Sequence, residues 1–495
     1  SLLGVEPDVP GLLGLSRDYL VAQLTAWRIG ARRARAPDCM AEVVHRLSPA
    51  DVYAATAWLA SQPVPPGERP EAAFANPPPL ECGSLAPPNN AAEPASELPP
   101  VKEADVVQRG RELVTLGGCF SCHTAIGGAP FAGGRPIPTP FGTFYSPNIT
   151  PDLQTGIGHW SAEDFWRALH EGVSRDGRSL YPTFPYTNYT RVTRTDADAM
   201  FVYLKSLRAV PRANQAHEIR FPYDVRALLA GWRLLYFKPG VYRPNPARSA
   251  AWNRGAYLVQ GLGHCSACHE ARNSLGATRS GSEPVGGLVL DWYAPSLRSS
   301  SEAGVQDWRL EDIGTLLSTG VVRGSQASDR HAATMGPMGE VIHDSLQFAD
   351  PGDLQAMGVY LGSLPDETRT IRRFAPEALA GVRTITELGR KVYAEQCVRC
   401  HGDHGEGRLP AGPPLARNRV VTMTQAADPI RILLFGGYPP GTRGNPRPFG
   451  MPPFYPTLSD DQLADVLTYI RTSWGNDASP VFTAEFAENR GSPLW

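Results

Sequence analysis

The pentapeptide Cys-x-x-Cys-His occurs three times in this chain, and no other feature of the sequence limits the fold as strongly. This spacing is the attachment signal for c-type haem, in which the thiols add to the haem vinyl groups and the next histidine ligates the iron. We therefore predict three covalently bound haem c groups. The segments are Cys119–Cys122–His123, Cys265–Cys268–His269 and Cys397–Cys400–His401, with each histidine as the proximal ligand.

Other uses of paired cysteines fit this pattern less well. A zinc site needs two such pairs, or one pair with distant histidines, folding as one unit. In this chain the pairs are far apart, and each carries its own adjacent histidine. A thioredoxin-like motif would explain one pair, but not a histidine after all three.

The sequence around each motif predicts tandem class I cytochrome c domains, a mainly α fold with Pro-rich connectors. A glycine (Gly110, Gly255 or Gly389) stands shortly before each motif in a helical pattern. Each domain should close with an amphipathic helix that ends in an aromatic–aliphatic pair, at Tyr203, Tyr360 and Tyr469. Small residues let two helices approach closely, so we expect each glycine helix to cross its closing helix. The expected N-caps of the closing helices are Thr195, Asp350 and Ser459.

Residues 1–62 repeat the back half of such a domain without its haem motif. Ser48-Pro49-Ala50-Asp51 begins another closing-helix pattern, and a helical face precedes it. Either the haem was lost, or the sequence begins just after a motif; we favour the second interpretation. In that case Met40 is the ligand of a fourth haem, and otherwise Met40 is a core residue.

The chain divides at changes in composition, because Gly and Pro contribute 49 and 48 of its 495 residues. The expected divisions are a half-domain at 1–62, a Pro-rich connector at 63–100, haem domain 1 at 101–210, a connector with an aromatic helix at 211–250, haem domain 2 at 251–365, a connector at 366–383, haem domain 3 at 384–475 and a tail at 476–495.

Charge and hydropathy restrict the cellular setting. The net charge of −2 gives no indication of nucleic-acid binding, and no apolar run is long enough for a transmembrane helix. Haem is attached to thiols outside the cytoplasm, so we expect an exported protein. In that setting the remaining cysteines, Cys39 and Cys82, are most simply a disulfide, with free thiols or an intermolecular bridge as alternatives.

Two methionines stand where a class I domain supplies its second axial ligand. Met338 in MGPMGEV and Met451 in FGMPPF each lie beside a proline that would stiffen the loop. Histidine–methionine ligation raises a haem's reduction potential. We predict both as iron ligands, and Met335 as a packing residue.

The first domain differs at this position. Its equivalent loop, LYPTFPYTNY, has Phe184 where the ligand is expected and contains no methionine. Met200 falls in the closing helix, and His159 and His170 are expected to be surface or packing residues. The first haem should therefore be five-coordinate or carry an unusual ligand, with a potential different from the other two.

Residues 221–250 contain a short apolar and aromatic segment, FPYDVRALLAGWRLLYFKPGVY. The segment is too short to span a bilayer. Ordinary packing between two haem domains is one interpretation. The alternative is a surface that faces a partner subunit or the membrane interface.

Beyond these residues, the chain resembles the triheme cytochrome c subunits of bacterial membrane-bound dehydrogenases over residues 101–475. The resemblance rests on the segments FAGGRPIPTPFGTFYSPNITPD, TGIGHWSAEDFWRAL, DGRSLYP, NRGAYLVQGLGHCSACH, WYAPSL, GPMGEV and LTYIRTSWGN. It implies the same proximal histidines and the ligands Met338 and Met451. The family usually has methionine at the position of Phe184, so this site departs from its pattern.

The resemblance implies an electron relay rather than an enzyme. A catalytic subunit with PQQ, flavin or a molybdenum cofactor would oxidise an alcohol, aldehyde or sugar, and the electrons would pass through the haems to ubiquinone or a terminal oxidase. The location implied is the periplasmic face of the inner membrane, peripheral to its surface. Two alternatives remain: a freestanding periplasmic shuttle, and a haem enzyme that uses a five-coordinate first haem. No nucleotide-binding or Ser/His/Asp pattern indicates a substrate-oxidising site.

Overall fold

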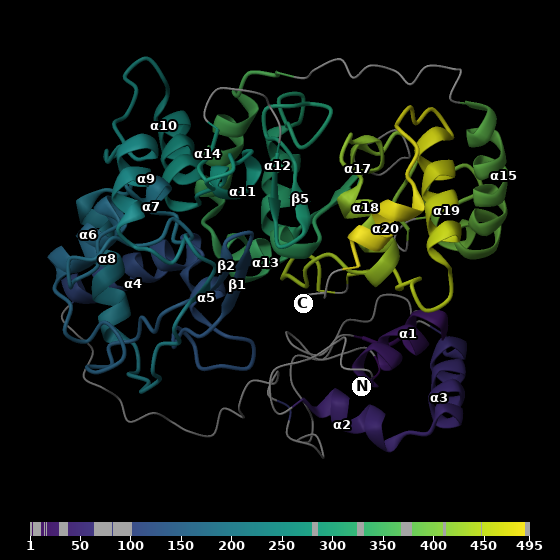
Figure 1. The fold of residues 1–495 in the computed structure, drawn as a ribbon, viewed down its shortest axis with the longest axis horizontal. Coiled ribbons are helices and arrows are strands. Elements are labelled where there is room, and N and C mark those ends of the chain that lie inside the picture. The colour runs from purple at the N-terminus through teal and green to yellow at the C-terminus, as the bar shows by residue number, and fades with distance from the viewer. Residues whose placement is uncertain are drawn as a thin grey trace.

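The computed structural model is built mainly from helices (Figure 1). The strands within the described residues are short and form small antiparallel sheets, so the predicted mainly α class is confirmed. The structure describes residues 11–13, 17–28, 38–63, 101–279, 286–323, 331–367, 379–408, 412–446 and 448–490, together with Leu2, Leu15 and Cys82.

Two crossing helices frame each haem-motif region. The crossing pairs are α4 (Val101–Leu116) with α8 (Arg194–Ser206), α10 (Ala250–Tyr257) with α14 (Pro351–Gly362), and α15 (Leu379–Gln396) with α19 (Asp460–Thr472). In Figure 1 the α15 and α19 pair lies at the C-terminal end of the colour scale, beside α18 (Ala427–Phe435) and α20 (Thr483–Glu488). The sequence expectation of tandem helix crossings is confirmed.

The predicted glycines stand at the crossings, where no larger residue fits. A Cβ on Gly110 would lie 2.0 Å from the carbonyl oxygen of Ala199, and a Cβ on Gly255 would lie 1.9 Å from that of Ala356. Gly389 meets the carbonyl oxygen of Asp465 at 2.0 Å in the same way. Such distances exclude a side chain, because they lie far inside van der Waals contact. The tyrosine of each closing helix also borders the contact: Tyr203, Tyr360 and Tyr469.

The closing helices begin at side-chain caps, with one correction to the sequence expectation. Ser459 caps α19 in a capping box with Gln462, and Asp350 caps α14 ahead of a proline.

The cap of α8 is Thr193 and not Thr195. The Thr193 hydroxyl accepts the amide N–H of Asp196 at 3.2 Å. Both threonines have an aspartate three residues later, so local spacing could not choose between them. With the earlier start, the Asp196 carboxylate reaches the Tyr257 hydroxyl, which donates to it at 2.6 Å.

The remaining helices of each domain lie between its glycine helix and its closing helix. In the first two domains these are α5 (Cys119–His123), α6 (Ala162–Glu171), α7 (Tyr186–Tyr189), the π-helix η1 (Leu258–Leu262), α11 (Ser266–His269), α12 (Leu310–Thr319), α13 (Gly336–Asp344) and the 3₁₀ helix η2 (Leu346–Phe348). The third domain adds α16 (Val398–His401) and α17 (Arg419–Thr422). The apolar residues of the first two domains form one continuous buried cluster, and the third domain has its own.

Short hairpins follow the first two motifs. Strand β1 (Pro136–Thr139) pairs antiparallel with β2 (Gly142–Tyr145), with Ile137 opposite Phe144, and β2 pairs with β3 (Glu218–Ile219). In the second domain β4 (Gly287–Val289) pairs with β5 (Trp292–Ala294) and β6 (Val321–Arg323) with β7 (His331–Ala333). The strands β2 and β5 end shortly before Pro147 and Pro295, so each hairpin fixes a proline beside its haem motif.

The N-terminal segment forms three helices: α1 (Arg17–Arg28), α2 (Cys39–Arg46) and α3 (Pro49–Ser61). Ser48 and Asp51 make the expected capping box at α3, and α1 packs against α3. Met40 lies in the first turn of α2. A disulfide joins Cys39 to Cys82, with the Cα atoms 5.0 Å apart. Apart from Pro63 and Cys82, the predicted connector at 63–100 lies outside the described residues.

The other predicted connectors contain more structure than expected. Helix α9 (Leu228–Tyr236) lies within the range 211–250, and α15 begins at Leu379, inside the range predicted as a connector at 366–383. Residues 368–378 of that range are outside the described part. The predicted tail contains α20, whose Phe486 is fully buried against the third domain. Among the described helices, none combines the length and hydropathy needed to cross a bilayer.

Candidate haem-attachment sites

Each Cys-x-x-Cys-His segment folds as a short helical turn directly after the glycine helix. The turns are α5, α11 and α16, with Cys265 and Cys397 as the N-caps of the second and third. In a helical turn, residues three and four apart lie on one face. The two cysteines and the histidine of each motif therefore point to the same side, which is the arrangement that a haem with two vinyl groups and one iron requires.

All three motif histidines make the same hydrogen bond. The ring Nδ1–H of His123 donates to the carbonyl oxygen of Pro147 at 2.7 Å. His269 donates to Pro295 at 2.7 Å, and His401 donates to Pro413 at 2.8 Å. A carbonyl oxygen can only accept, so the proton lies on Nδ1 and the Nε2 lone pair is available for a metal. These residues fit the iron of a c-type haem.

Burial sets the protonation state of these groups. It lowers the pKa of His123, His269 and His401, which favours the neutral imidazole that binds a metal. Burial also raises the pKa of Cys119, Cys265 and Cys397 to about 12.

Thiols with pKa values this high are poor thiolates, whereas a redox-active pair needs the thiolate. In the part of the chain that the structure describes, no group of three or more His, Cys, Asp or Glu side chains is placed to hold a metal ion. The geometry thus gives no support to the zinc or thioredoxin alternatives. Thioether attachment to haem requires no thiolate in the finished protein.

The two predicted methionine ligands occupy structured positions in their domains. Met338 lies in the first turn of α13 and packs against the core shared by the first two domains. Met451 lies in a loop whose backbone pairs with Gly437, which donates its N–H to the Met451 carbonyl at 3.0 Å. Met335 caps α13, and its Sδ lies 3.5 Å from where a Cβ of Gly437 would be. The assignment of Met338 and Met451 to iron stays a prediction.

The first site has no methionine in the corresponding loop. Phe184 packs against the core there, with its ring centroid 5.4 Å from that of Tyr189.

The other candidate ligands of the first domain lie elsewhere in it. Met200 is fully buried in α8. His170 stacks on Trp166 and its Nδ1 is 2.9 Å from the Thr190 carbonyl, while His159 is exposed. The sixth ligand of the first haem stays an open prediction.

Sequence reasoning missed the three proline carbonyls that orient the histidines. The only available signal was a proline downstream of each motif: Pro147 and Pro295 stand 24 and 26 residues after their histidines, and Pro413 stands 12 residues after His401. A carbonyl is a backbone group that any residue carries, so residue type alone could not identify this acceptor.

Comparisons with known proteins agree with this geometry. A family model for cytochrome c matches residues 386–474. A nicotinate dehydrogenase component from Pseudomonas putida is 41% identical over 76% of this chain and 31% of its own length. The cytochrome c subunit of alcohol dehydrogenase (quinone) from Gluconacetobacter polyoxogenes is 35% identical, covering 78% of this chain and 84% of that protein. The gluconate 2-dehydrogenase cytochrome c subunit from Pantoea cypripedii is 36% identical, covering 77% of this chain and 88% of that protein.

The chain belongs to the family of dehydrogenase cytochrome c subunits. As a dehydrogenase cytochrome c subunit, it binds haem c covalently and transfers electrons rather than oxidising a substrate. The chain spans about a third of the length of the nicotinate dehydrogenase relative.

The first and second domains of this dehydrogenase cytochrome c subunit are joined at their haem-attachment turns. The Arg135 guanidinium forms a bidentate pair with Glu340 on α13, with one N–O distance of 2.8 Å. The Ser121 hydroxyl, inside the first motif, donates to Asp344 at 3.1 Å. His264, directly before Cys265, lies with its Nε2 3.3 Å from the Gly117 carbonyl. The first motif thus rests on the helix of Met338 and on the segment leading into the second motif.

The second and third domains of the cytochrome meet through α18 and the loop around Met451. The Tyr293 amide N–H donates to the Asp428 carboxylate at 2.8 Å. The Arg419 guanidinium donates to the Gly304 carbonyl at 2.7 Å, and the Thr442 hydroxyl donates to the Thr319 carbonyl at 3.2 Å. The methionine loops of the second and third sites therefore face the same domain boundary.

Proposed function

We propose that this dehydrogenase cytochrome c subunit carries three haems c and relays single electrons from a catalytic dehydrogenase subunit to ubiquinone or a terminal oxidase. The observation that carries the proposal is the histidine–proline hydrogen bond, which recurs at His123, His269 and His401. Bound haem iron supplies one-electron oxidation and reduction. One functional haem site per motif is the simplest reason for keeping this geometry three times.

The protein's own residues attach, orient and tune the cofactors. The cysteine pairs fix each haem to the chain, and the proline carbonyls hold each imidazole in one orientation. Met338 and Met451 would raise the potentials of the second and third haems, because a thioether ligand favours the reduced iron. The shared core of the first two domains packs against Cys119 and Cys265, the first cysteines of their motifs.

The order of the domains supports a relay that follows the chain. The first motif region contacts the second domain through Ser121–Asp344 and His264–Gly117. The second domain contacts the third at the methionine loops, near Met335 and Gly437. Electrons therefore pass through the second haem on their way between the first and the third.

The proposal of a catalytic partner is based on the named relatives and not on a residue of this chain. The relatives are named as subunits of nicotinate, alcohol, gluconate and fructose dehydrogenases. The partner of this chain would carry PQQ, flavin or a molybdenum cofactor and oxidise a substrate of this general kind, on the periplasmic face of the inner membrane.

The segment around α9 supports a peripheral position on the membrane surface. One face of α9 packs between domains, where Leu229 meets the first hairpin and the Trp232 indole donates to the Leu275 carbonyl at 2.9 Å. On the other face, Leu234 and Leu235 are 86% and 70% exposed. Phe221, which precedes the helix, is 80% exposed. An exposed apolar face beside cations is typical of a helix at the lipid headgroup level.

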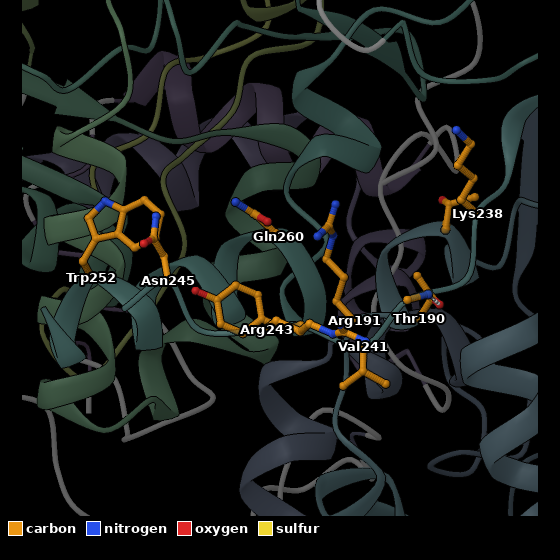
Figure 2. A pocket seen from close by; sticks show the side chains of 11 residues that line it. Thr190, Arg191, Lys238, Val241, Arg243, Asn245, Trp252 and Gln260 are labelled. Atoms are coloured by element: carbon orange, nitrogen blue, oxygen red, sulfur yellow. Dashed lines mark hydrogen bonds between the residues drawn. The ribbon is translucent and has the colours of Figure 1, made fainter. Parts of the chain in front are cut away.

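A pocket of about 440 Å³ lies on the connector that follows α9, between the first two domains (Figure 2). Arg191, Lys238, Val241 and Arg243 are among the residues that line it. Figure 2 places Arg191 and Val241 side by side, with Lys238 further along the connector. Cationic side chains at this level would attract anionic lipid headgroups.

The relay is tested on the complex extracted gently from native membranes. The reduced haem absorption is followed while alcohols, aldehydes and sugar acids are added one at a time, and the co-purifying chains are identified by mass spectrometry. We expect rapid reduction by one substrate class and one companion dehydrogenase chain. Reduction by none of them, with no companion chain, would overturn the subunit proposal in favour of a freestanding shuttle.

The membrane position is tested by vesicle sedimentation of the purified cytochrome. We expect Leu234→Asp with Leu235→Asp to weaken binding to vesicles that contain anionic phospholipid. Leu153→Asp is the control, because Leu153 is 59% exposed and lies in a loop of the first domain rather than in α9. Unchanged vesicle binding combined with loss of the companion chain would show instead that α9 faces the partner subunit.

A further inference from the structure

Arg431 is the most deeply buried cation at the boundary between the second and third domains. Its side chain is 1% exposed in the middle of α18, and its Nε and Nη1 atoms have no hydrogen-bond partner among the residues that the structure describes. The nearest carboxylate oxygen, on Asp291, is 4.0 Å from Nη1, which is too long for a hydrogen bond. A buried guanidinium needs a compensating anion.

A second buried donor lies next to it. The indole Nε1–H of Trp292 also has no hydrogen-bond partner within the described residues. The guanidinium carbon of Arg431 is 5.5 Å from the centroid of the Trp292 ring. Two unpartnered donors from two different domains are thus gathered in one small region.

The position of Trp292 relates this region to the second haem site. Trp292 stands three residues before Pro295, whose carbonyl accepts from His269. Its ring also packs on Gly336, two residues before Met338, since a Cβ on Gly336 would lie 2.6 Å from the ring atoms. The indole therefore bridges the segments that supply the proximal histidine and the predicted methionine.

The position of Arg431 relates the same region to the third site. Arg431 stands five residues before Gly436, the C-cap of α18, and the next residue, Gly437, pairs with Met451. The Met335 side chain approaches Gly437 from the second domain. Arg431 is therefore within one short loop of Met451, a predicted ligand, and of Met335.

Within the described part of the chain, the neighbouring carboxylates leave the two donors unsatisfied. Asp428 accepts the Tyr293 amide N–H at 2.8 Å, and Asp291 has a largely exposed side chain. An acceptor with a negative charge would satisfy both donors. Each haem carries two propionate carboxylates, and a guanidinium binds a carboxylate with a matching pair of donors.

We propose that Arg431 and Trp292 together bind a propionate carboxylate of the second or third haem. The inference rests on the proposed binding of haem at these motifs. The negative charge of a propionate stabilises the oxidised iron, and a cation beside the propionate offsets that charge. The pair therefore raises the reduction potential of the haem that it contacts. Because one donor comes from each domain, the same propionate also joins the third domain to the second.

The test is a spectroelectrochemical titration of the haem-loaded protein. We expect Arg431→Leu to lower one of the three midpoint potentials and to make it fall with rising pH across the neutral range, because the propionate then titrates there. Arg431→Lys should restore part of the shift, since it keeps the charge but not the forked donors. Trp292→Phe should shift the same potential less, and it is the informative variant if Arg431→Leu fails to fold.

Three comparisons identify the ligand. Met338→Leu and Met451→Leu each mark one potential, so the potential that Arg431→Leu also moves tells whether the second or third haem supplies the propionate. Trp252→Phe is the control indole, because its Nε1–H already donates to Ser363 at 2.7 Å. Asp291→Asn should leave all potentials unchanged; if it reproduces the effect of Arg431→Leu, the partner of Arg431 is Asp291 and the inference is wrong.

Two further outcomes separate this inference from the proposed function. Three covalent haems, with no potential shifted in any Arg431 or Trp292 variant, would refute the propionate site alone. Fewer than three covalent haems in the unmodified protein, measured by its intact mass, would refute the haem count proposed for the relay.

Discussion

Phe184 is the residue by which the first haem site differs from the other two. It occupies the loop that corresponds to the one carrying Met338 in the second domain, and its ring packs on Tyr189 instead of offering an electron pair. Single residues of this kind decide axial ligation, because an iron accepts a thioether or imidazole but not a phenyl ring. Changing one side chain should therefore have a measurable effect on ligand binding at the first haem and on the reduction potential of the second.

At the first haem, the prediction concerns an open coordination position. We expect the reduced protein to bind carbon monoxide at one haem, and Phe184→Met to abolish that binding and raise the potential of that haem. Absorption spectra under carbon monoxide and a redox titration measure both effects. Phe201→Met, at a buried position of α8, is the control and should leave carbon monoxide binding intact. Absence of carbon monoxide binding in the unmodified protein would contradict a five-coordinate first haem.

At the second haem, the prediction concerns the choice between neighbouring methionines. Met338→Leu should lower one midpoint potential, because leucine keeps the volume but removes the thioether. Met335→Leu should leave the potential of every haem close to its original value, since Met335 packs at the domain boundary near Gly437. Redox titration of both variants is the measurement, and the reverse result would make Met335 the ligand.

At the scale of elements, the crossing of two helices is the frame of each domain. Its closeness depends on Gly110, Gly255 and Gly389, and a methyl group at any of them would overlap a backbone carbonyl of the opposite helix. Helix boundaries were less predictable. By sequence spacing, Thr193 and Thr195 were equally suitable as the N-cap of α8. The helix begins after Thr193, where Asp196 also accepts a hydrogen bond from Tyr257.

We expect Gly255→Ala to lower the free energy of unfolding by about 1–3 kcal/mol or to prevent folding, because the two backbones must separate. Gly314→Ala is the matched change, since Gly314 lies inside α12 with no atom within 4 Å of a new Cβ. It should raise the free energy of unfolding by up to about 1 kcal/mol through helix propensity. Urea unfolding of both haem-loaded variants measures the difference, and equal effects would show that the crossing tolerates a side chain.

At the scale of the whole molecule, the domains are held in chain order by polar contacts at their boundaries. Arg135 with Glu340 joins the first two domains, and Asp428 with the Tyr293 amide joins the second to the third. Each contact lies beside a haem motif or a predicted methionine ligand. The boundaries that stabilise the arrangement are therefore also the places where electrons would pass between haems.

The boundary at Asp428 should depend on pH. Burial raises the pKa of Asp428 to about 7 from its ordinary value of 3.8, although the Tyr293 amide and Arg431 act in the opposite direction. A carboxyl whose pKa is raised in the folded state stabilises that state fully below its unfolded pKa. This contribution, at most about 4 kcal/mol, is lost as the pH rises from about 4 through about 7.

Asp428→Asn should remove this loss, so that the free energy of unfolding of the variant changes less between about pH 4 and about pH 8. Denaturant unfolding at a series of pH values is the measurement. Asp105→Asn, at an exposed position of α4, should keep the dependence of the unmodified protein. An unchanged slope in Asp428→Asn would show that Asp428 is not the source of the pH dependence.

The sequence by itself determined the cofactor class, the three motif histidines and the crossing glycines, because covalent attachment and close helix approach each demand a particular residue type at a particular spacing. It also indicated the tandem mainly α fold. Only the tertiary structure decided which carbonyl orients each histidine, which methionine packs at a boundary and which donors Arg431 and Trp292 leave unpaired. Those features depend on backbone groups and on residues far apart in the chain, and such pairs meet only after the domains have folded and packed together.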